Sequence, residues 1–441
     1  MNHRNTASIR DANAPWNLWK IFLPGVDEEA WQDAARKAAH VLSNLPASSL
    51  GSIDEMLEAV LMERQFGEGH WRLSVAKRVY YSIVRPILPV SIRPLLRRLL
   101  LAPQKERLPL DWPIEDRYVR FQFEMLRNVM DGAGVRSAPY IGLWPDGKRY
   151  AFVLTHDIET GRGQKFVRKV MELEERYGFR SCFNFVPEDY EVDLSLLDEL
   201  RERGFEVGVH GLKHDGKLFR SQRSFRRRVD RINRYLKEWN ATGFRAPFTH
   251  RHPEWMQMLN IEYDSSFFDT DPFETIPGGT MSIWPFMIGD FVELPYTLPQ
   301  DHTLISTLGE KTPRLWLEKV DFIEQHGGLA MMITHPDYLL APGCFAIYEE
   351  FLKKMSARTG YWHQLPGEVA RWWKQRLAMD SSVPPDGNSG PGNGAVIGTI
   401  RMDDKIVRGD VPTSRPIHLL PQIAVAALQV LSLFSLIPYL I

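Results

Sequence analysis

The chain has 441 residues, of which 44 % are hydrophobic and 25 % charged, shares that are typical of a soluble globular protein with a large core. The formal net charge of −1 argues against a protein that binds nucleic acid through its overall charge. The two cysteines, Cys182 and Cys344, are too few for a disulfide framework and form no Cys-x-x-Cys pair, so we expect two buried thiols.

Residues 1–147 are predicted to be mostly helical. Apolar residues recur with helical spacing over residues 27–45 and again over 52–65, where Ser52 suits a helix start. Residues 1–20 contain no apolar run. We therefore expect no secretory signal peptide and a cytoplasmic location.

A basic stretch at residues 77–105 follows, in which Pro86, Pro89 and Pro94 interrupt any long helix. Its arginines lie among isoleucines and leucines, a pattern that can bind an anionic membrane surface. The same pattern is typical of a helix that packs on its own protein and leaves its arginines in solvent. Both interpretations stay open.

From residue 149 onward, short apolar runs alternate with helical patterns. The apolar runs predict strands at 150–155, 181–186, 205–210, 242–245, 291–294 and 329–334. The helical patterns lie at 164–177, 194–203, 221–239 and 313–326. Buried strands separated by helices of this length are typical of a parallel α/β sheet or barrel.

Composition divides the chain into four predicted parts. These are an N-terminal helical region at 1–147, an α/β domain at 148–378, a Pro/Gly/Ser-rich flexible linker at 379–416 and a hydrophobic tail at 417–441. Residues 423–441 carry no charge, and a membrane-spanning helix needs about 20 apolar residues. Because two prolines and two glutamines weaken the tail pattern, it is predicted either to anchor in a membrane or to pack as a C-terminal helix.

Polar clusters follow four of the predicted strands. They are Thr155-His156-Asp157-Ile158-Glu159, the pair His210 and His214, Arg245-Ala246-Pro247-Phe248, and His335-Pro336. Side chains just past the carboxyl ends of parallel strands converge on one site. We therefore expect these clusters to meet.

The two histidines of the second cluster are four residues apart, so both imidazoles can face a single divalent ion. Asp157 or Glu159 can supply an oxygen ligand, and three protein ligands leave a position open, as in catalytic sites. The remaining carboxylate can take a proton from water. His335 can give a proton to a departing amine, because imidazole is suited to acid catalysis near neutral pH.

Each of these residues also has a purely structural interpretation. Asp157 and Glu159 can cap the following helix, and Arg245 can belong to a buried ion pair. His335 can be a loop histidine with its hydrogen bonds satisfied. The presence of all of them at strand ends favours a functional site.

The order of the clusters resembles the polysaccharide deacetylase (NodB-like) superfamily, whose members remove acetyl groups from N-acetylated sugars. The resemblance covers roughly residues 149–340 and implies a distorted (β/α) barrel of about seven strands. The first motif resembles the Asp-x-Glu variant, which implies Asp157 as the base and Glu159 as a metal ligand, although the reverse assignment stays open. The second motif implies His210 and His214 as metal ligands, with Gly211 in place of the usual hydroxyl residue.

The other motifs imply roles for residues later in the chain. Arg245 of the third motif is implied to orient the base carboxylate by a charge-assisted hydrogen bond. His335 of the final motif is implied to be the general acid. The polar-ended loop at 294–301 can line the substrate cleft. Four residues are expected to contact the substrate: Pro247, Phe248, Asp264 and Tyr296.

The resemblance implies metal-dependent hydrolysis of a carbon–nitrogen (non-peptide) amide bond. The first hypothesis is N-deacetylation of an exopolysaccharide, or of its lipid-linked precursor, by metal-activated water, with zinc as the expected ion. The alternatives are an amidohydrolase that acts on a small cyclic amide and a non-catalytic glycan-binding relative. We expect an N-acetylated glycan as partner, no nucleic acid, and membrane contact only through the tail or residues 77–105.

Overall fold

The computed structural model describes residues 12–67, 69–73, 77, 108–381, 394–402 and 406–408. The tail at 417–441 and the basic stretch apart from Lys77 lie outside these residues, so their predicted membrane contacts remain predictions. None of the helices in the described ranges combines the length and the apolar character needed to cross a membrane. Both cysteines are buried, as expected.

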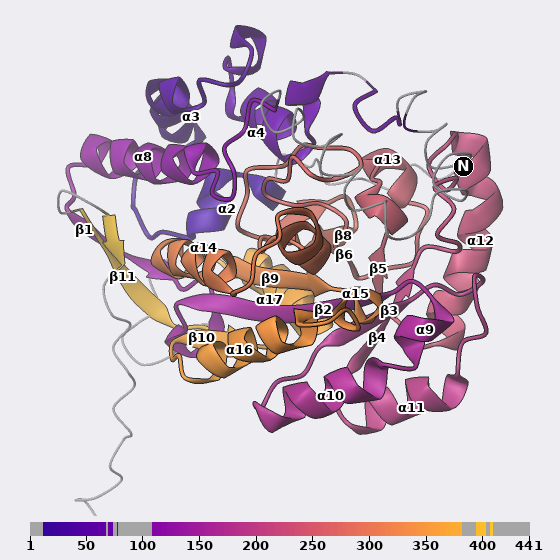
Figure 1. Cartoon of the computed structure of the whole chain (residues 1–441). Helices are drawn as coiled ribbons and strands as arrows, with labels where there is room; N and C mark the ends of the chain where they lie inside the picture. Colours follow the sequence, from indigo (N-terminus) through magenta and orange to yellow (C-terminus); the bar gives the residue numbers. More distant parts are fainter. Residues whose placement is uncertain are drawn as a thin grey trace, which may run out of the picture.

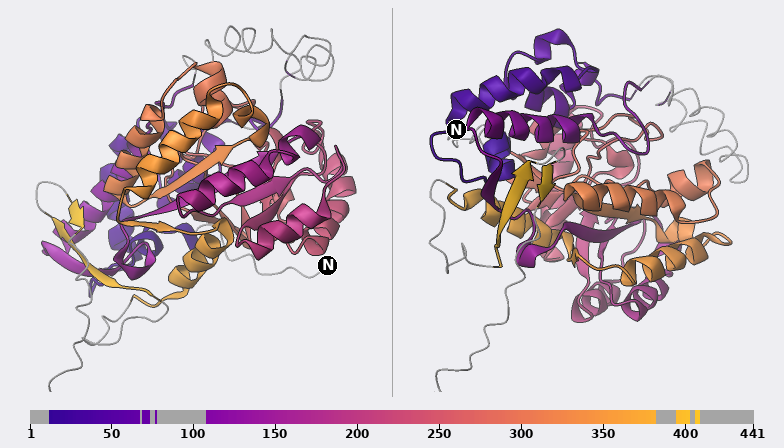
Figure 2. Two further views of the ribbon diagram at one scale, coloured as in Figure 1. Left: turned by 60° about the horizontal axis from the view of Figure 1, so that its bottom comes forward. Right: turned by 90° about the vertical axis from the view of Figure 1, so that its left-hand side faces the viewer.

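Helices are the main regular elements in the described part of the N-terminal region, as predicted, although strand β1 (Ser137–Ile141) also lies there. They are α2 (Pro15–Trp19), α3 (Glu28–Ala38), α4 (Ile53–Leu61) and α8 (Arg117–Gly132). The side chain of Asp27 accepts a hydrogen bond from the Ala30 N–H at the start of α3, and Ser52 accepts one from Glu55 at the start of α4. These helices gather on one side of the barrel (Figure 1, top; Figure 2, right).

A curved sheet forms the centre of the molecule, in the order β10-β2-β3-β4-β5-β6-β8-β7, with β9 paired to β2. All of its pairs are parallel except β7 with β8. The strands are β2 (Tyr150–Ile158), β3 (Cys182–Phe185), β4 (Glu206–His210), β5 (Gly243–Arg245), β6 (Tyr263–Asp264), β7 (Phe286–Ile288), β8 (Phe291–Glu293), β9 (Leu329–Thr334) and β10 (Tyr361–His363). Every residue of β2 and β9 is buried, which explains their unbroken apolar runs.

Backbone hydrogen bonds link the two ends of this sheet. The N–H groups of Thr297 and Leu298, which follow β8, both donate to the carbonyl oxygen of Met331 in β9. The sheet therefore curls into a distorted barrel, and the predicted α/β fold class is confirmed.

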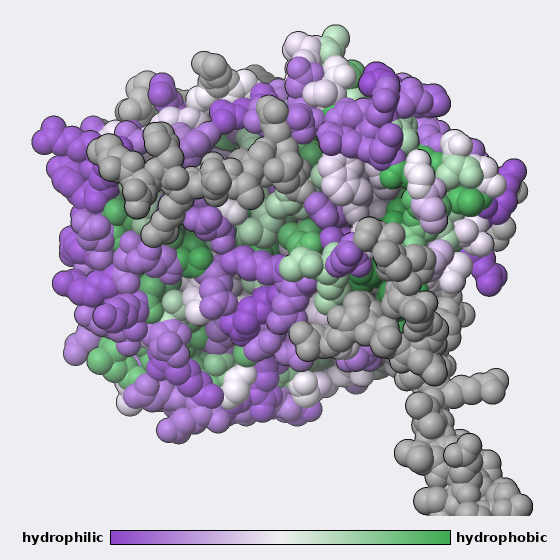
Figure 3. Space-filling model, turned by 180° about the vertical axis from the view of Figure 1, so that it is seen from behind, coloured by the Kyte–Doolittle hydropathy of each residue, from purple (hydrophilic) through white to green (hydrophobic). Residues whose placement is uncertain are grey.

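Helices cover the outside of the barrel. The longer ones are α10 (Val167–Arg176), α11 (Leu194–Glu202), α12 (Gln222–Glu238), α14 (Arg314–His326), α16 (Cys344–Ser356) and α17 (Pro366–Ala378). The short ones are α9 (Gly161–Gln164), α13 (Pro253–Met256) and α15 (Pro336–Leu339). Helices α10 and α11 lie on the side opposite the N-terminal helices (Figure 1). Hydrophilic residues predominate on the rear face, with smaller hydrophobic areas between them (Figure 3).

A second, antiparallel sheet corrects the prediction of a flexible linker at 379–416. Strands β11 (Ile397–Met402) and β12 (Ile406–Arg408) lie within that range, and β11 pairs with β1 (Ser137–Ile141). The physical reason is that burial alternates along β11, where Gly398 and Ile400 are buried and Thr399 and Arg401 are not. The predicted division of the chain into four parts is otherwise untested and stays a prediction.

Candidate active site

The site begins at the carboxyl end of β2, where successive residues point to opposite sides. Thr155 and Asp157 share one side, because Arg245 Nη1 donates to Thr155 Oγ1 at 2.9 Å and to Asp157 Oδ1 at 3.0 Å. His156 points the other way, and its Nε2 lies 2.7 Å from Glu174 Oε1 in α10. Asp157 therefore faces the site, whereas His156 belongs to the packing between the sheet and α10.

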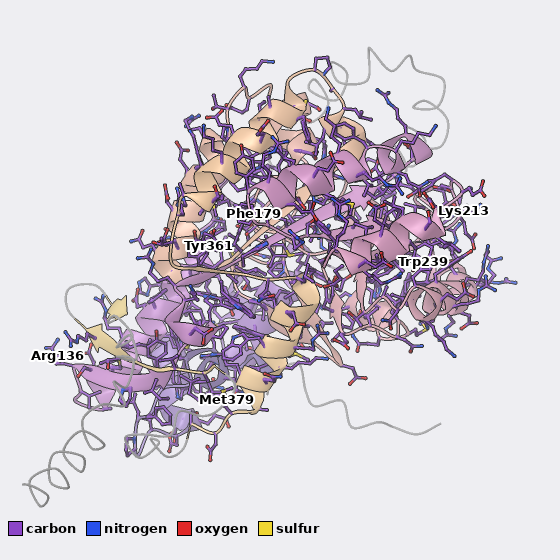
Figure 4. The ribbon with its side chains drawn as sticks, turned by 90° about the horizontal axis from the view of Figure 1, so that it is seen from below. Arg136, Phe179, Lys213, Trp239, Tyr361 and Met379 are labelled. Carbon is purple, nitrogen blue, oxygen red and sulfur yellow. The ribbon has the colours of Figure 1, made fainter. Side chains whose placement is uncertain are left out.

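The three predicted metal ligands come together. Glu159 lies just beyond β2, His210 ends β4, and His214 lies in the turn that follows β4. One ligand atom from each lies within 4.8 Å of the others, and His214 Nε2 is 3.1 Å from Glu159 Oε1. Lys213 marks the position of this turn in Figure 4. The turn lies at the end of the molecule opposite Arg136, the residue before β1.

A backbone carbonyl orients the His210 imidazole, and a carboxylate holds the turn that carries His214. His210 Nδ1 lies 3.1 Å from the backbone carbonyl oxygen of Arg245. A carbonyl can only accept, so Nδ1 carries the proton and Nε2 keeps its lone pair free. The backbone N–H of His214 donates to Asp189 Oδ2 at 2.6 Å, which fixes the turn. Two imidazoles and one carboxylate at this spacing fit a divalent ion such as zinc and leave a coordination position open.

Charge keeps Asp157 ionised. Burial raises the pKa of this carboxyl, but the charges of Arg245 and His335 and the hydrogen bond from Asn184 outweigh burial, and the pKa falls to about 2. Its Oδ1 atom accepts hydrogen bonds from Asn184 Nδ2 at 2.9 Å and from Arg245. Its Oδ2 atom lies 3.9 Å from His210 Nδ1. Oδ2 is thus the oxygen that remains available to accept a proton.

His335 is paired with an acidic residue. Its backbone N–H donates to Asp301 Oδ2 at 2.8 Å, and its Nδ1 lies 2.7 Å from Asp301 Oδ1. Burial lowers the pKa of His335, but the charge of Asp301 outweighs it and raises the pKa to about 10. The other ring nitrogen, Nε2, lies 4.0 Å from Glu159 Oε1. His335 can therefore carry a proton on Nε2, on the side that faces Glu159, one of the three candidate metal ligands.

The four residues predicted to contact the substrate differ in burial and in their distance from the candidate metal ligands. Phe248 is half-buried, and its ring centroid lies 4.2 Å from that of His214, so it borders the ligand group. Pro247, next to it, is buried. Asp264 and Tyr296 are almost fully buried, and their oxygens already bond to protein groups: Ser266 for Asp264, and Asp271 and Glu274 for Tyr296. Contact of these four residues with substrate stays a prediction.

Two residues of the site were not predicted in the roles that the structure gives them. Asp301 was expected only within a loop that lines the cleft, yet it is the partner of His335. Asn184 lies in β3 and donates to Asp157. A polar residue within a buried apolar strand is a usable signal, because buried polar groups need partners.

The fold and the site together are those of an α/β barrel with a group of two histidines and one carboxylate at the carboxyl ends of its strands. Flanking this group are a carboxylate bound by an arginine and a histidine bound by an aspartate. Neither the family models nor the curated proteins compared with the sequence match it.

Similar solved structures include two that are described as polysaccharide deacetylases and one described as an allantoinase. A protein from Mycobacterium smegmatis, provisionally called a polysaccharide deacetylase, is 18 % identical, with a TM-score of 0.44 over 55 % of this chain and 96 % of that one. A probable polysaccharide deacetylase from Pseudomonas aeruginosa PAO1 is 15 % identical, with a TM-score of 0.44 over 53 % and 93 %. Puue allantoinase is 14 % identical, with a TM-score of 0.43 over 53 % and 92 %. At such low similarity, the chemistry of this chain has to be derived from its own site.

Proposed function

We propose that the chain is a metal-dependent hydrolase that removes the acetyl group from the nitrogen of an N-acetylated glycan. One observation carries the proposal: Asp157 and the Asp301–His335 pair flank the group formed by Glu159, His210 and His214. A proton acceptor and a proton donor thus lie on either side of a set of metal ligands, which is the arrangement that hydrolysis of an amide requires.

Each residue of the site is proposed to have a separate role in hydrolysis. Glu159, His210 and His214 would hold the ion, which supplies Lewis acidity that polarises a carbonyl and makes water more acidic. Asp157 accepts the proton of the attacking water on Oδ2, because Arg245 and Asn184 occupy Oδ1. Arg245 also keeps this carboxylate ionised and fixed in orientation.

Departure of the amine needs a proton donor. His335 donates from Nε2 to the amide nitrogen as the carbon–nitrogen bond breaks, and free amine and acetate leave. Asp301 accepts the hydrogen bond from Nδ1, which directs the other nitrogen toward the substrate and stabilises the charged ring.

The proposed ion is zinc, because two imidazoles and a carboxylate are a common catalytic zinc set. The proposed substrate is an exopolysaccharide or its lipid-linked precursor. A second candidate, hydrolysis of a small cyclic amide, is favoured by burial: Asp157, His210 and His335 are all at most 5 % exposed, which suits a small substrate or the end of a glycan chain.

Metal analysis and a substrate panel test the proposal. Wild-type protein should bind one divalent ion and release acetate from N-acetylglucosamine oligomers. His210→Ala and His214→Ala should lose both the ion and the activity, since each removes a ligand. The control is His156→Gln, which changes a histidine of β2 that points away from the site.

The outcomes separate the candidates. Acetate release from oligomers with no hydrolysis of cyclic ureides supports the deacetylase. Hydrolysis of ureides alone supports the second candidate. Ion binding without turnover of either class would favour a glycan-binding relative, and full metal content in both histidine variants would contradict the proposed ligand set.

A further inference from the structure

The N-terminal helical region reaches the active site through a buried ion pair. Glu63, just after α4, receives hydrogen bonds on both carboxylate oxygens from the guanidinium of Arg251 in the barrel domain. The two side chains are only 6 % and 3 % exposed. Glu63 Oε1 also accepts the backbone N–H of Gly279 at 2.8 Å. The pair therefore joins α4 to two separate loops of the barrel.

Arg251 in turn holds the loop at residues 247–251. Its Nη1 donates to the carbonyl oxygen of Thr249 at 3.0 Å. Phe248 and Thr249 both have positive φ, 59° and 51°, which is unfavourable for residues other than glycine. Backbone of this kind persists only where its surroundings hold it in place. Arg251, fixed by Glu63, is one such constraint.

This loop packs directly on the turn that carries the two histidines. The Phe248 ring lies 4.2 Å from the His214 ring, centroid to centroid. A Cβ atom added to Gly211 would lie 2.5 Å from Pro247 Cδ, so the turn and the loop are in close contact. A shift of the loop must therefore displace the histidine turn.

We propose that Glu63 is a positioning residue of the active site. Through Arg251 it fixes the loop at 247–251, and that loop fixes the turn that bears His210 and His214. The N-terminal helical region is then a working part of the site. The consequence for ion affinity rests on the proposed function, whereas the consequence for the loop does not.

The test compares Glu63→Gln with Glu115→Gln in the full chain. Glu115 is the matched control: it also forms a buried ion pair in the N-terminal region, with Arg117, and its other bonds stay within residues 109–117. Hydrogen exchange is measured at the amides of 248–251 and 211–214, and the zinc dissociation constant is measured by chelator competition. Arg251→Lys is a second variant in case Glu63→Gln does not fold.

Glu63→Gln should speed exchange in both segments and weaken zinc binding roughly tenfold, as loss of a residue that orients ligands does. Glu115→Gln should change neither, even if it lowers stability as much. Equal exchange of the 248–251 amides in the two variants would overturn the proposal. If wild-type protein binds no zinc, the proposed function fails, and hydrogen exchange alone still decides the role of Glu63.

Discussion

At the scale of single residues, the site is built from pairs in which one member holds the other. Arg245 holds Asp157, Asp301 holds His335, and the carbonyl oxygen of Arg245 sets the tautomer of His210. The motif residues could be predicted because each follows a buried strand. Asp301 could not be predicted as the partner of His335, because 34 residues separate them and only the curled sheet brings them together.

Asp301→Asn tests the pairing with His335. Without the carboxylate, the protonated imidazole loses its stabilising charge, so we expect kcat to fall about a hundredfold or more. Steady-state kinetics on the best substrate of the panel measure this. Metal content serves as the control and should equal that of wild type, because Asp301 is not among the three proposed ligands. An unchanged kcat would show that His335 does not depend on Asp301.

At the scale of elements, the long and fully buried strands could be predicted from the sequence. The long apolar runs of β2 and β9 were predicted within a few residues, whereas β6, with two residues, is too short to give a periodic pattern. Strand β11 was missed because the Pro- and Gly-rich composition before it dominated the interpretation. Its pairing with β1, more than 250 residues earlier, is a tertiary contact that local composition does not encode.

Gly211→Ala tests the contact between the histidine turn and the loop at 247–251. Gly211 has φ of 65°, and its new Cβ would meet Pro247. We expect a loss of about 1–3 kcal/mol in unfolding free energy and weaker metal binding. Gly204→Ala is the control, since Gly204 also has positive φ (79°) but the nearest atom to its Cβ is Arg180 Nε at 3.6 Å. Equal metal affinity in the two variants would contradict the packing described.

At the scale of the whole molecule, helix α17 is tied directly to α2 and to the segment that contains β1. Arg376 of α17 is fully buried, and its guanidinium donates to four backbone carbonyl oxygens. These belong to Asn17, Leu18, Ile141 and Gly142. The helical and α/β regions could each be predicted from the sequence. The contact between them through Arg376 could not, because its carbonyl partners lie more than 230 residues away in the chain.

Arg376→Lys tests this junction. Lysine keeps the charge but cannot reach four carbonyls in the guanidinium geometry, so we expect a loss of about 2–4 kcal/mol in the free energy of unfolding. Urea titration measures the loss. The control is Arg371→Lys on the same helix, an exposed residue whose ion pairs are each worth at most about 1 kcal/mol. Similar losses in both variants would show that the junction adds no stability.

Lys20 provides a pH test of the same junction, because its Nζ donates to the carbonyl oxygens of Leu377 and Met379 at 2.7 Å. Burial and the charge of Arg376 lower its pKa from 10.5 to about 8. Between these values the unfolded chain binds more protons, so the contribution of Lys20 to stability increases as pH rises. Lys20→Met should lack this increase between pH 8 and 10 in urea titrations. Parallel pH curves for both proteins would contradict the lowered pKa.

The central claim is that Glu159, His210 and His214 share one ion, flanked by Asp157 and His335. A crystal structure of the zinc-loaded protein, with anomalous scattering at the zinc edge, tests this claim most directly. We predict a single strong peak about 2.0–2.2 Å from Glu159 Oε1, His210 Nε2 and His214 Nε2. Asp301, His302 and His335 are a second group whose ligand atoms lie within 4.8 Å of one another. A peak bound to these three residues instead, or no peak near His210, would contradict the shared ion site.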